Sequence, residues 1–122
     1  TYRTIDASQQ LQRTGLGYAN SGWHNSETVA YIRAHPELSE ERMVSTGEMG
    51  IYFWTGRKPR VIADFPDPQL LRAYLCDNEA VLFLMDQMPV EIYGLEHAKV
   101  VQTLEHVQDF NDSEMYRCPQ GR

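Results

Sequence analysis

The chain has 122 residues, close to the commonest size of a single domain, and two domains would each lack apolar material for a core. Its 42% hydrophobic and 23% charged residues are globular proportions, which exclude a chain that stays disordered. The net charge is −6 and the basic residues are scattered, which argues against nucleic-acid binding. The longest apolar run, Ala80 to Met85, is far below the roughly 20 residues of a membrane span, so the chain as given is expected to be soluble.

The first 22 residues differ in character from the rest. They contain Gly15, Gly17 and Gly22 and little apolar periodicity, although a short helix around 8–13 is an option. We therefore predict a tether over 1–22 and a single α/β domain over 23–122. Because the chain starts without methionine, we expect it to be a piece of a longer protein.

The first half of the domain is predicted to alternate helices and strands. Ser26 can cap a helix that Pro36 ends, and Gly56 is well placed just beyond the end of a second helix. Met43-Val44-Ser45 is a short run that leads into a turn, as a buried strand would. The predicted elements are a helix over 26–35, a strand over 43–45, a helix over 48–55 and a strand over 60–63.

The second half continues the alternation and closes on a hairpin. Asp67 followed by Pro68 is a cap with proline at the first helical position. Residues 80–85 are apolar on both faces, as a central strand covered by helices on both sides should be. The predicted elements are a helix ending near 77, the central strand over 80–85, a helix over 95–106, and strands over 107–110 and 114–118.

This order of elements predicts the fold class. Alternating helices and strands give a parallel sheet sandwiched by helices, and right-handed crossovers leave few topologies. We expect an α/β, three-layer, Rossmann-like sandwich with a mainly parallel sheet of about five strands. The closing hairpin should add one antiparallel strand at an edge.

The sequence contains no recognisable signature of a catalytic, cofactor-binding or metal-binding site. Thr46-Gly47-Glu48-Met49-Gly50 is not a phosphate-binding glycine turn, because no lysine follows and Glu48 would repel phosphate. His97 and His106 would point to opposite sides of a helix, so they do not form a metal face. The chain also contains no G-x-S-x-G motif. We predict no catalytic residue, no cofactor and no metal.

Polar residues at the predicted strand ends give one candidate crevice. Open parallel sheets bind ligands at the carboxyl ends of their strands. Ser45, Thr46, Asp64 and Asp86 would lie there. The favoured alternative is that they serve as helix caps and exposed turn residues.

Two further features leave alternatives open. Cys76 and Cys118 are either two idle thiols, which is the favoured interpretation, or one disulfide in an oxidising compartment. The aromatic run 52–54 either packs into the core, again the favoured interpretation, or forms a sugar-stacking surface. Residues 111–113 match the N-glycosylation pattern, but they are also ordinary turn residues.

The order of several motifs carries a family resemblance. The segments are Asn25-Ser26-Glu27-Thr28-Val29-Ala30-Tyr31-Ile32-Arg33, Met49-Gly50-Ile51-Tyr52-Phe53-Trp54-Thr55-Gly56-Arg57, residues 80–85, and Asp109-Phe110-Asn111-Asp112-Ser113-Glu114-Met115-Tyr116-Arg117. Together they resemble the soluble C-terminal domain of polytopic membrane glycosyltransferases, the bacterial relatives of the dolichyl-phosphate-mannose protein mannosyltransferases. The resemblance covers roughly residues 15 to 118.

The resemblance implies a parent protein that transfers sugar from a polyprenyl-phosphate donor, with its catalytic residues in a transmembrane part absent here. This chain would be a non-catalytic accessory domain on the extracytoplasmic (periplasmic) face, serving acceptor binding, active-site closure or assembly. Its implied partners are the transmembrane part of the same polypeptide and a glycan or lipid-linked sugar. The tether over 1–22 and a Cys76 to Cys118 bridge would suit that place.

Two other function classes compete with this expectation. One is a free-standing module that binds a small ligand, or regulates, through the crevice at the strand ends. The other is an autonomous enzyme, the least favoured because no nucleophile, base and orienting group can be named together.

Overall fold

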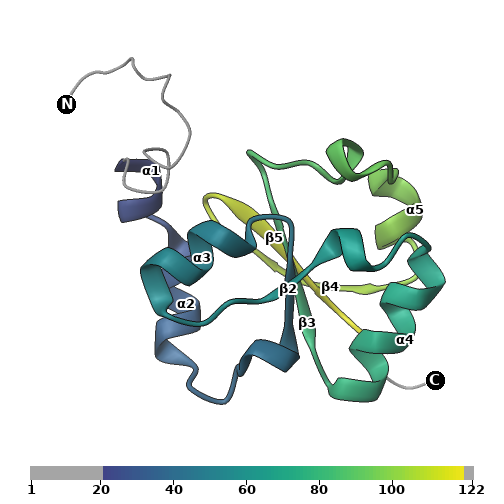
Figure 1. The fold of residues 1–122 in the computed structure, drawn as a ribbon, viewed down its shortest axis with the longest axis horizontal. Coiled ribbons are helices and arrows are strands. Elements are labelled where there is room, and N and C mark those ends of the chain that lie inside the picture. The colour runs from purple at the N-terminus through teal and green to yellow at the C-terminus, as the bar shows by residue number, and fades with distance from the viewer. Residues whose placement is uncertain (1–20, 120–122) are drawn as a thin grey trace.

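The computed structural model describes residues 21–119, which form one open five-stranded sheet with helices on both faces (Figure 1). The strands are β1 (Met43–Ser45), β2 (Arg60–Val61), β3 (Val81–Met85), β4 (Glu105–Asp109) and β5 (Ser113–Arg117). The α-helices are α1 (Ser21–His24), α2 (Glu27–Ala34), α3 (Glu48–Thr55), α4 (Pro68–Asn78) and α5 (His97–Val101). Three short 3-10 helices are η3 (Glu40–Arg42), η4 (Ile62–Asp64) and η5 (Val90–Tyr93).

The sheet is mixed. Its order is β2-β1-β3-β5-β4, with β1 parallel to β2 and β3, and β5 antiparallel to β3 and β4. The predicted α/β class is confirmed, and β3 is the central strand as expected. The expected parallel pairing is confirmed for β2-β1-β3 only, because β3, β5 and β4 pair antiparallel. The expected antiparallel edge strand is wrong in position: β4 takes the edge and the hairpin folds β5 back between β3 and β4. A tight hairpin requires antiparallel neighbours, so this half of the sheet is antiparallel.

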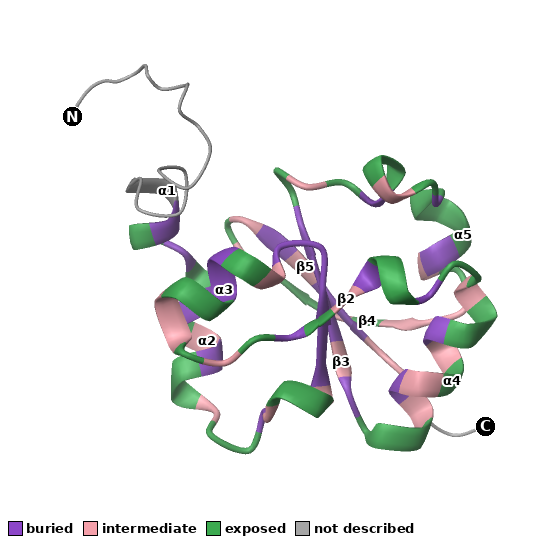
Figure 2. Ribbon diagram, viewed as in Figure 1, coloured by how far each residue is buried: buried purple, intermediate pink, exposed green. Residues whose placement is uncertain are grey.

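Two hydrophobic cores lie on the two faces of the sheet. Along β3, Phe83 and Met85 point into the core beneath α1, α2 and α3, whereas Leu82 and Leu84 point into the core beneath α4 and α5. Because successive strand residues face opposite sides, a strand covered by helices on both faces must be apolar throughout. Figure 2 shows the buried residues concentrated in the middle of the sheet and on the inner sides of the helices.

The predicted helix caps are present. The Ser26 hydroxyl accepts a hydrogen bond from the Val29 amide at 3.0 Å, and the Asp67 carboxylate accepts one from the Gln69 amide at 2.9 Å, just before Pro68. Gly56 ends α3 at φ 78°, a left-handed conformation in which a side chain would be strained. These local signals therefore set the start of α2 and α4 and the end of α3.

Several predicted boundaries shift. The strand over 60–63 stops at Val61, after which Ile62 turns inward and begins η4. The helix over 95–106 is only α5, and β4 begins at Glu105. Leu104 lies in the turn between α5 and β4 and still packs against the core. The apolar residues at every third position therefore continue past the end of the helix, which is why the pattern predicts a longer helix.

The described part of the chain begins with α1, whose first residues, Ser21 and Gly22, are the last two of the predicted tether. The rest of the predicted tether, with the expected helix around 8–13, lies outside the described residues. Between residues 21 and 119, no helix combines the length and apolar character that crossing a membrane requires.

Candidate functional site

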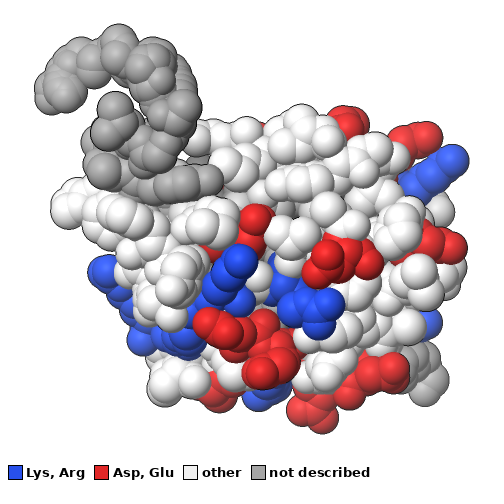
Figure 3. All heavy atoms as spheres, viewed as in Figure 1, with Lys and Arg blue, Asp and Glu red and all other residues white. Residues whose placement is uncertain are grey.

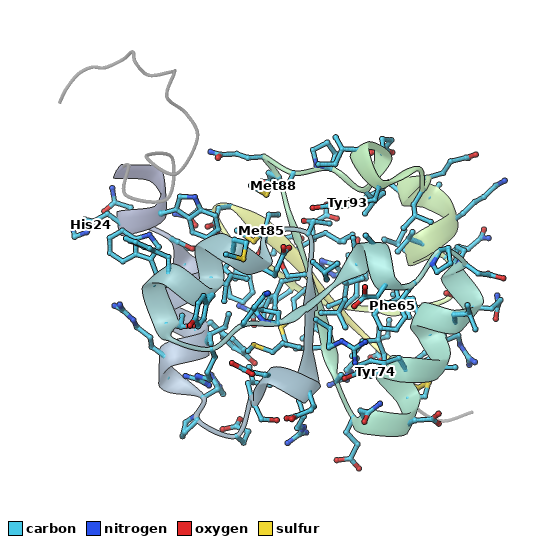
Figure 4. All side chains as sticks on the ribbon, viewed as in Figure 1. His24, Phe65, Tyr74, Met85, Met88 and Tyr93 are labelled. Carbon is cyan, nitrogen blue, oxygen red and sulfur yellow. A yellow bond between two sulfur atoms is a disulfide. The ribbon has the colours of Figure 1, made fainter. Side chains whose placement is uncertain are left out.

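The carboxyl ends of β1 and β3 are the place where this fold would hold a ligand. The chain leaves β1 through α3, which covers one face of the sheet, and reaches β3 through α4, which covers the other, so a crevice is expected between the two strand ends. A hollow lies beside the end of β3, between Trp23 of α1 and Asp112 of the closing hairpin, and Met85 and Met88, which also line it, are labelled in Figure 4. Its volume is about 20 Å³, room for about one water molecule. It is lined by Trp23, Met85, Gln87, Met88 and Asp112.

The indole of Trp23 packs against the segment that follows β1 and lines this hollow. A Cβ atom at Gly50 would overlap the six-membered ring of the indole, and a Cβ at Gly47 would lie 3.5 Å from the ring and 2.7 Å from Met85 Cγ. Trp23 itself is buried. The glycines of the Thr46 to Gly50 segment therefore give an aromatic ring of the same chain close access to the backbone of α3. Sequence reasoning missed this role of Trp23, because an isolated tryptophan in a glycine-rich stretch carries no periodic signal.

Ser45 and Thr46 are at the predicted edge of the sheet, but their side chains face inward. Both are fully buried. The Ser45 hydroxyl accepts a hydrogen bond from the Gly47 amide at 3.0 Å, and the Thr46 hydroxyl accepts one from the Met85 amide at 2.9 Å. The hydroxyl of Tyr93, labelled in Figure 4, donates to the Thr46 carbonyl at 3.0 Å. These groups fasten the ends of β1, β3 and η5 to one another.

Asp64 and Asp86 lie in separate surroundings. Asp64 pairs with Arg60 at 3.4 Å on the β2 edge. Asp86 follows β3, where lost hydration and then repulsion from Glu114, Asp112 and Asp109 raise its pKa. Asp64 is thus held at the β2 edge, whereas Asp86 lies among the carboxylates of the closing hairpin.

Asp112 has a role that its place in a turn conceals. The hydroxyls of Ser26 and Thr28 both donate to its carboxylate, the second at 2.7 Å, and Thr28 Oγ1 lies 2.6 Å from Ser113 Oγ. The Asp112 carbonyl also accepts from the Asp86 amide at 2.9 Å. The carboxylate thus sits at the start of α2, where the helix dipole favours negative charge. This network joins the closing hairpin to α2.

The neighbouring Asn111 is engaged in the same junction. Its side-chain amide donates to the Asn25 carbonyl at 3.0 Å, and its backbone amide donates to the Glu27 carboxylate at 2.8 Å. The Glu27 amide in turn donates to the Asn111 side-chain oxygen at 3.0 Å. The residues that match the glycosylation pattern therefore hold the hairpin against α2.

Two arginines cap the ends of α2 and α3 reciprocally: Arg57, which follows α3, caps α2, and Arg33 of α2 caps α3. The Arg57 guanidinium donates to the carbonyls of Ile32, His35 and Leu38 at 2.7, 3.1 and 2.8 Å, which satisfies the end of α2. Arg33 donates to the Trp54 carbonyl at the end of α3, with its Nε at 3.1 Å. Both arginines lie in the segments that carry the family resemblance. Their contacts are structural, because free carbonyls at a helix end need donors.

The outer side of α3 is an apolar surface. Met49, Tyr52 and Phe53 are 41%, 47% and 60% exposed, and we call these three residues the α3 stripe. The prediction of core packing is wrong for Tyr52 and Phe53, because the helical period turns Gly50 and Ile51 inward and the stripe outward. Trp54 is half-buried beside the stripe, with its ring centroid 5.7 Å from that of Phe53 and 5.9 Å from that of His24. His24 is labelled in Figure 4.

Cys76 on α4 and Cys118 just after β5 form a disulfide with an S–S distance of 2.06 Å. A disulfide is the less favoured of the two alternatives drawn from the sequence, and it is the one that the structure contains. It fastens the final strand to the helix layer on one face of the sheet.

Potential metal ligands are dispersed into pairs. His97 pairs with Glu114 at 2.9 Å and His106 pairs with Asp109 at 2.8 Å. Within the described residues, no three side chains of histidine, cysteine, aspartate or glutamate gather in a way that could hold a metal ion.

The chain matches no protein-family model, no curated protein and no solved structure.

Proposed function

We propose that this chain is a non-catalytic accessory domain of an integral-membrane glycosyltransferase, placed on the extracytoplasmic face and serving acceptor binding or assembly. The parent would use a polyprenyl-phosphate sugar donor. In this proposal the parallel half of the sheet, β2-β1-β3, is the Rossmann-like part of the domain, and the mixed half carries the hairpin.

The tight packing at the ends of β1 and β3 is the observation that carries the proposal. Trp23 packs against Gly47 and Gly50 just after β1, and the buried Ser45 and Thr46 hydroxyls accept hydrogen bonds from backbone amides. The volume of the nearby hollow, about 20 Å³, is far below the roughly 300 Å³ of the smallest typical ligand sites. A hollow of this size is too small for a sugar or a nucleotide, which supports a role exercised through contact with a partner.

Two other features support the cellular placement. The motif order resembles the C-terminal domain of membrane glycosyltransferases, and the residues that carry it build the junctions between α2, α3 and the hairpin. The Cys76 to Cys118 disulfide suits an oxidising compartment, since such bonds persist outside the reducing cytosol. The burial of Ser45 and Thr46 counts against the competing small-ligand module, because neither side chain is open to a ligand at the strand ends.

The proposal is tested by glycosyl transfer in membranes. Cells would express the full gene product, the same product lacking residues 21–119, and the 122-residue chain alone. With a polyprenyl-phosphate-linked sugar, we expect transfer by the full product, reduced transfer by the deletion, and none by the isolated chain. Turnover by the isolated chain, or a gene product that encodes no hydrophobic membrane segments, would overturn the proposal.

A further inference from the structure

We propose that the α3 stripe rests on the surface of a lipid bilayer, with Met49, Tyr52 and Phe53 entering the boundary between headgroups and acyl chains. The inference stands on the geometry of α3 and does not rest on the proposed glycosyltransferase parent. The partner is a bilayer of zwitterionic lipids.

Exposed hydrophobic side chains are concentrated on α3. Five large hydrophobic side chains of the described residues are exposed, and three of them belong to this one helix. Positions 49, 52 and 53 are spaced so that they lie along one side of α3. The other two, Leu70 and Ile92, are 54% and 64% exposed and stand singly on α4 and η5. Isolated exposed apolar residues are ordinary on protein surfaces, whereas contiguous ones more often mark an interaction site.

The stripe is also rigidly presented. Its helix is held from beneath by the Trp23 indole against Gly50, and its last turn is held by Arg33 at the Trp54 carbonyl. Gly56 and Arg57 then fasten the following turn to α2. The three side chains therefore need no ordering of the backbone before they meet a partner.

The shape of the surface separates lipid from other occupants. A second copy of the chain would need about 800 Å² on each partner, and an eight-residue helix about 12 Å long is too short to supply it. Phe53 and Trp54 stand at 72° to each other, so they do not form one flat aromatic platform on which neighbouring sugar rings could stack. The membrane interface imposes no such ring geometry, and tryptophan and tyrosine are enriched there.

The charges around the stripe decide which bilayer it suits. In Figure 3 the surface over α3 is mostly uncharged, and many of the acidic side chains in view lie below it or to its right. Arg33 is exposed, and its guanidinium is held at the Trp54 carbonyl at the end of the helix that carries the stripe. The chain as a whole carries a net charge of −6, so anionic lipid should repel it. A zwitterionic bilayer provides phosphates for Arg33 without that repulsion.

The experiment uses the 122-residue chain and phosphatidylcholine vesicles, with cosedimentation at millimolar lipid and quenching of tryptophan emission by brominated phosphatidylcholine. The test variant is Tyr52→Ser with Phe53→Ser, and the matched control is Leu70→Ser with Ile92→Ser. We expect the parent chain and the control to bind alike, and the test variant to lose about tenfold or more in partitioning. Circular dichroism verifies that both variants are folded, since all four positions are exposed.

Three results would overturn the inference. They are absence of both sedimentation and quenching, equal loss in the control variant, and a response of tryptophan emission to soluble oligosaccharide but not to vesicles. The last would assign the stripe to a glycan. Stronger binding when phosphatidylglycerol is added would also contradict the argument from charge. None of these outcomes depends on whether the full gene product transfers sugar, so the two proposals fail separately.

Discussion

Breaking the disulfide should remove a large part of the stability of the domain. The bond joins Cys76 to Cys118 across 42 positions. Closing a loop of that length in the unfolded chain lowers its entropy enough to stabilise the folded state by about 4 kcal/mol. That is a substantial share of the roughly 5 to 15 kcal/mol that holds an ordinary domain folded. Replacing both cysteines by serine should therefore lower the free energy of unfolding by about 4 kcal/mol.

Urea unfolding, followed by circular dichroism, measures this loss. The serine variant and the parent chain in reductant should unfold at a similar, lower midpoint, and the oxidised parent well above it. The slope of the transition should also rise in the variants, because the unbridged chain exposes more surface when it unfolds. A loss below about 1 kcal/mol would refute the reasoning, since the bond would then not restrain the unfolded chain.

Three other substitutions test parts of the structure. Gly50→Ala should destabilise the domain by about 1 to 3 kcal/mol in urea unfolding, because its methyl group meets the Trp23 ring; an unchanged midpoint would mean that the indole lies elsewhere. Asp112→Asn should cost about 1 to 3 kcal/mol, since Thr28 and its neighbours lose a charged acceptor, and a neutral result would contradict the proposed junction. Burial and the Glu114 carboxylate raise the pKa of Tyr116 to about 12 from an ordinary 10.0. The folded state therefore keeps a proton that the unfolded state releases, so stability should fall as pH rises above 10, and less steeply in Tyr116→Phe.

Local signals predicted a good part of the fold. The caps at Ser26 and Asp67 and the left-handed Gly56 depend on neighbouring residues alone, so the sequence displays them directly. The central strand was equally readable, because burial on both faces leaves a continuous apolar run. The position of β5 was not, since either strand of a hairpin can pair with the free edge of β3 and only tertiary packing decides which one does.

The sequence predicts where the candidate site lies, but not which interactions its residues make. Ser45 and Thr46 reach the expected sheet edge, yet nothing in their sequence context shows that their hydroxyls turn inward to backbone amides. Trp23 and Asp112 act across the domain on distant segments, and such contacts leave no local pattern. The aromatic run over 52–54 was misassigned, because its hydrophobicity suggests a core whereas the helical period directs two of its rings outward.

The most direct test of the central claim is to locate the native protein in the cells that produce it. An antibody raised against this chain would be used on separated membrane and soluble fractions, before and after protease treatment from the extracytoplasmic side. We predict a band much heavier than 14.1 kDa in the membrane fraction, resistant to carbonate extraction and cleaved from outside. A band of about that mass, confined to the soluble fraction and protected from protease, would contradict the account.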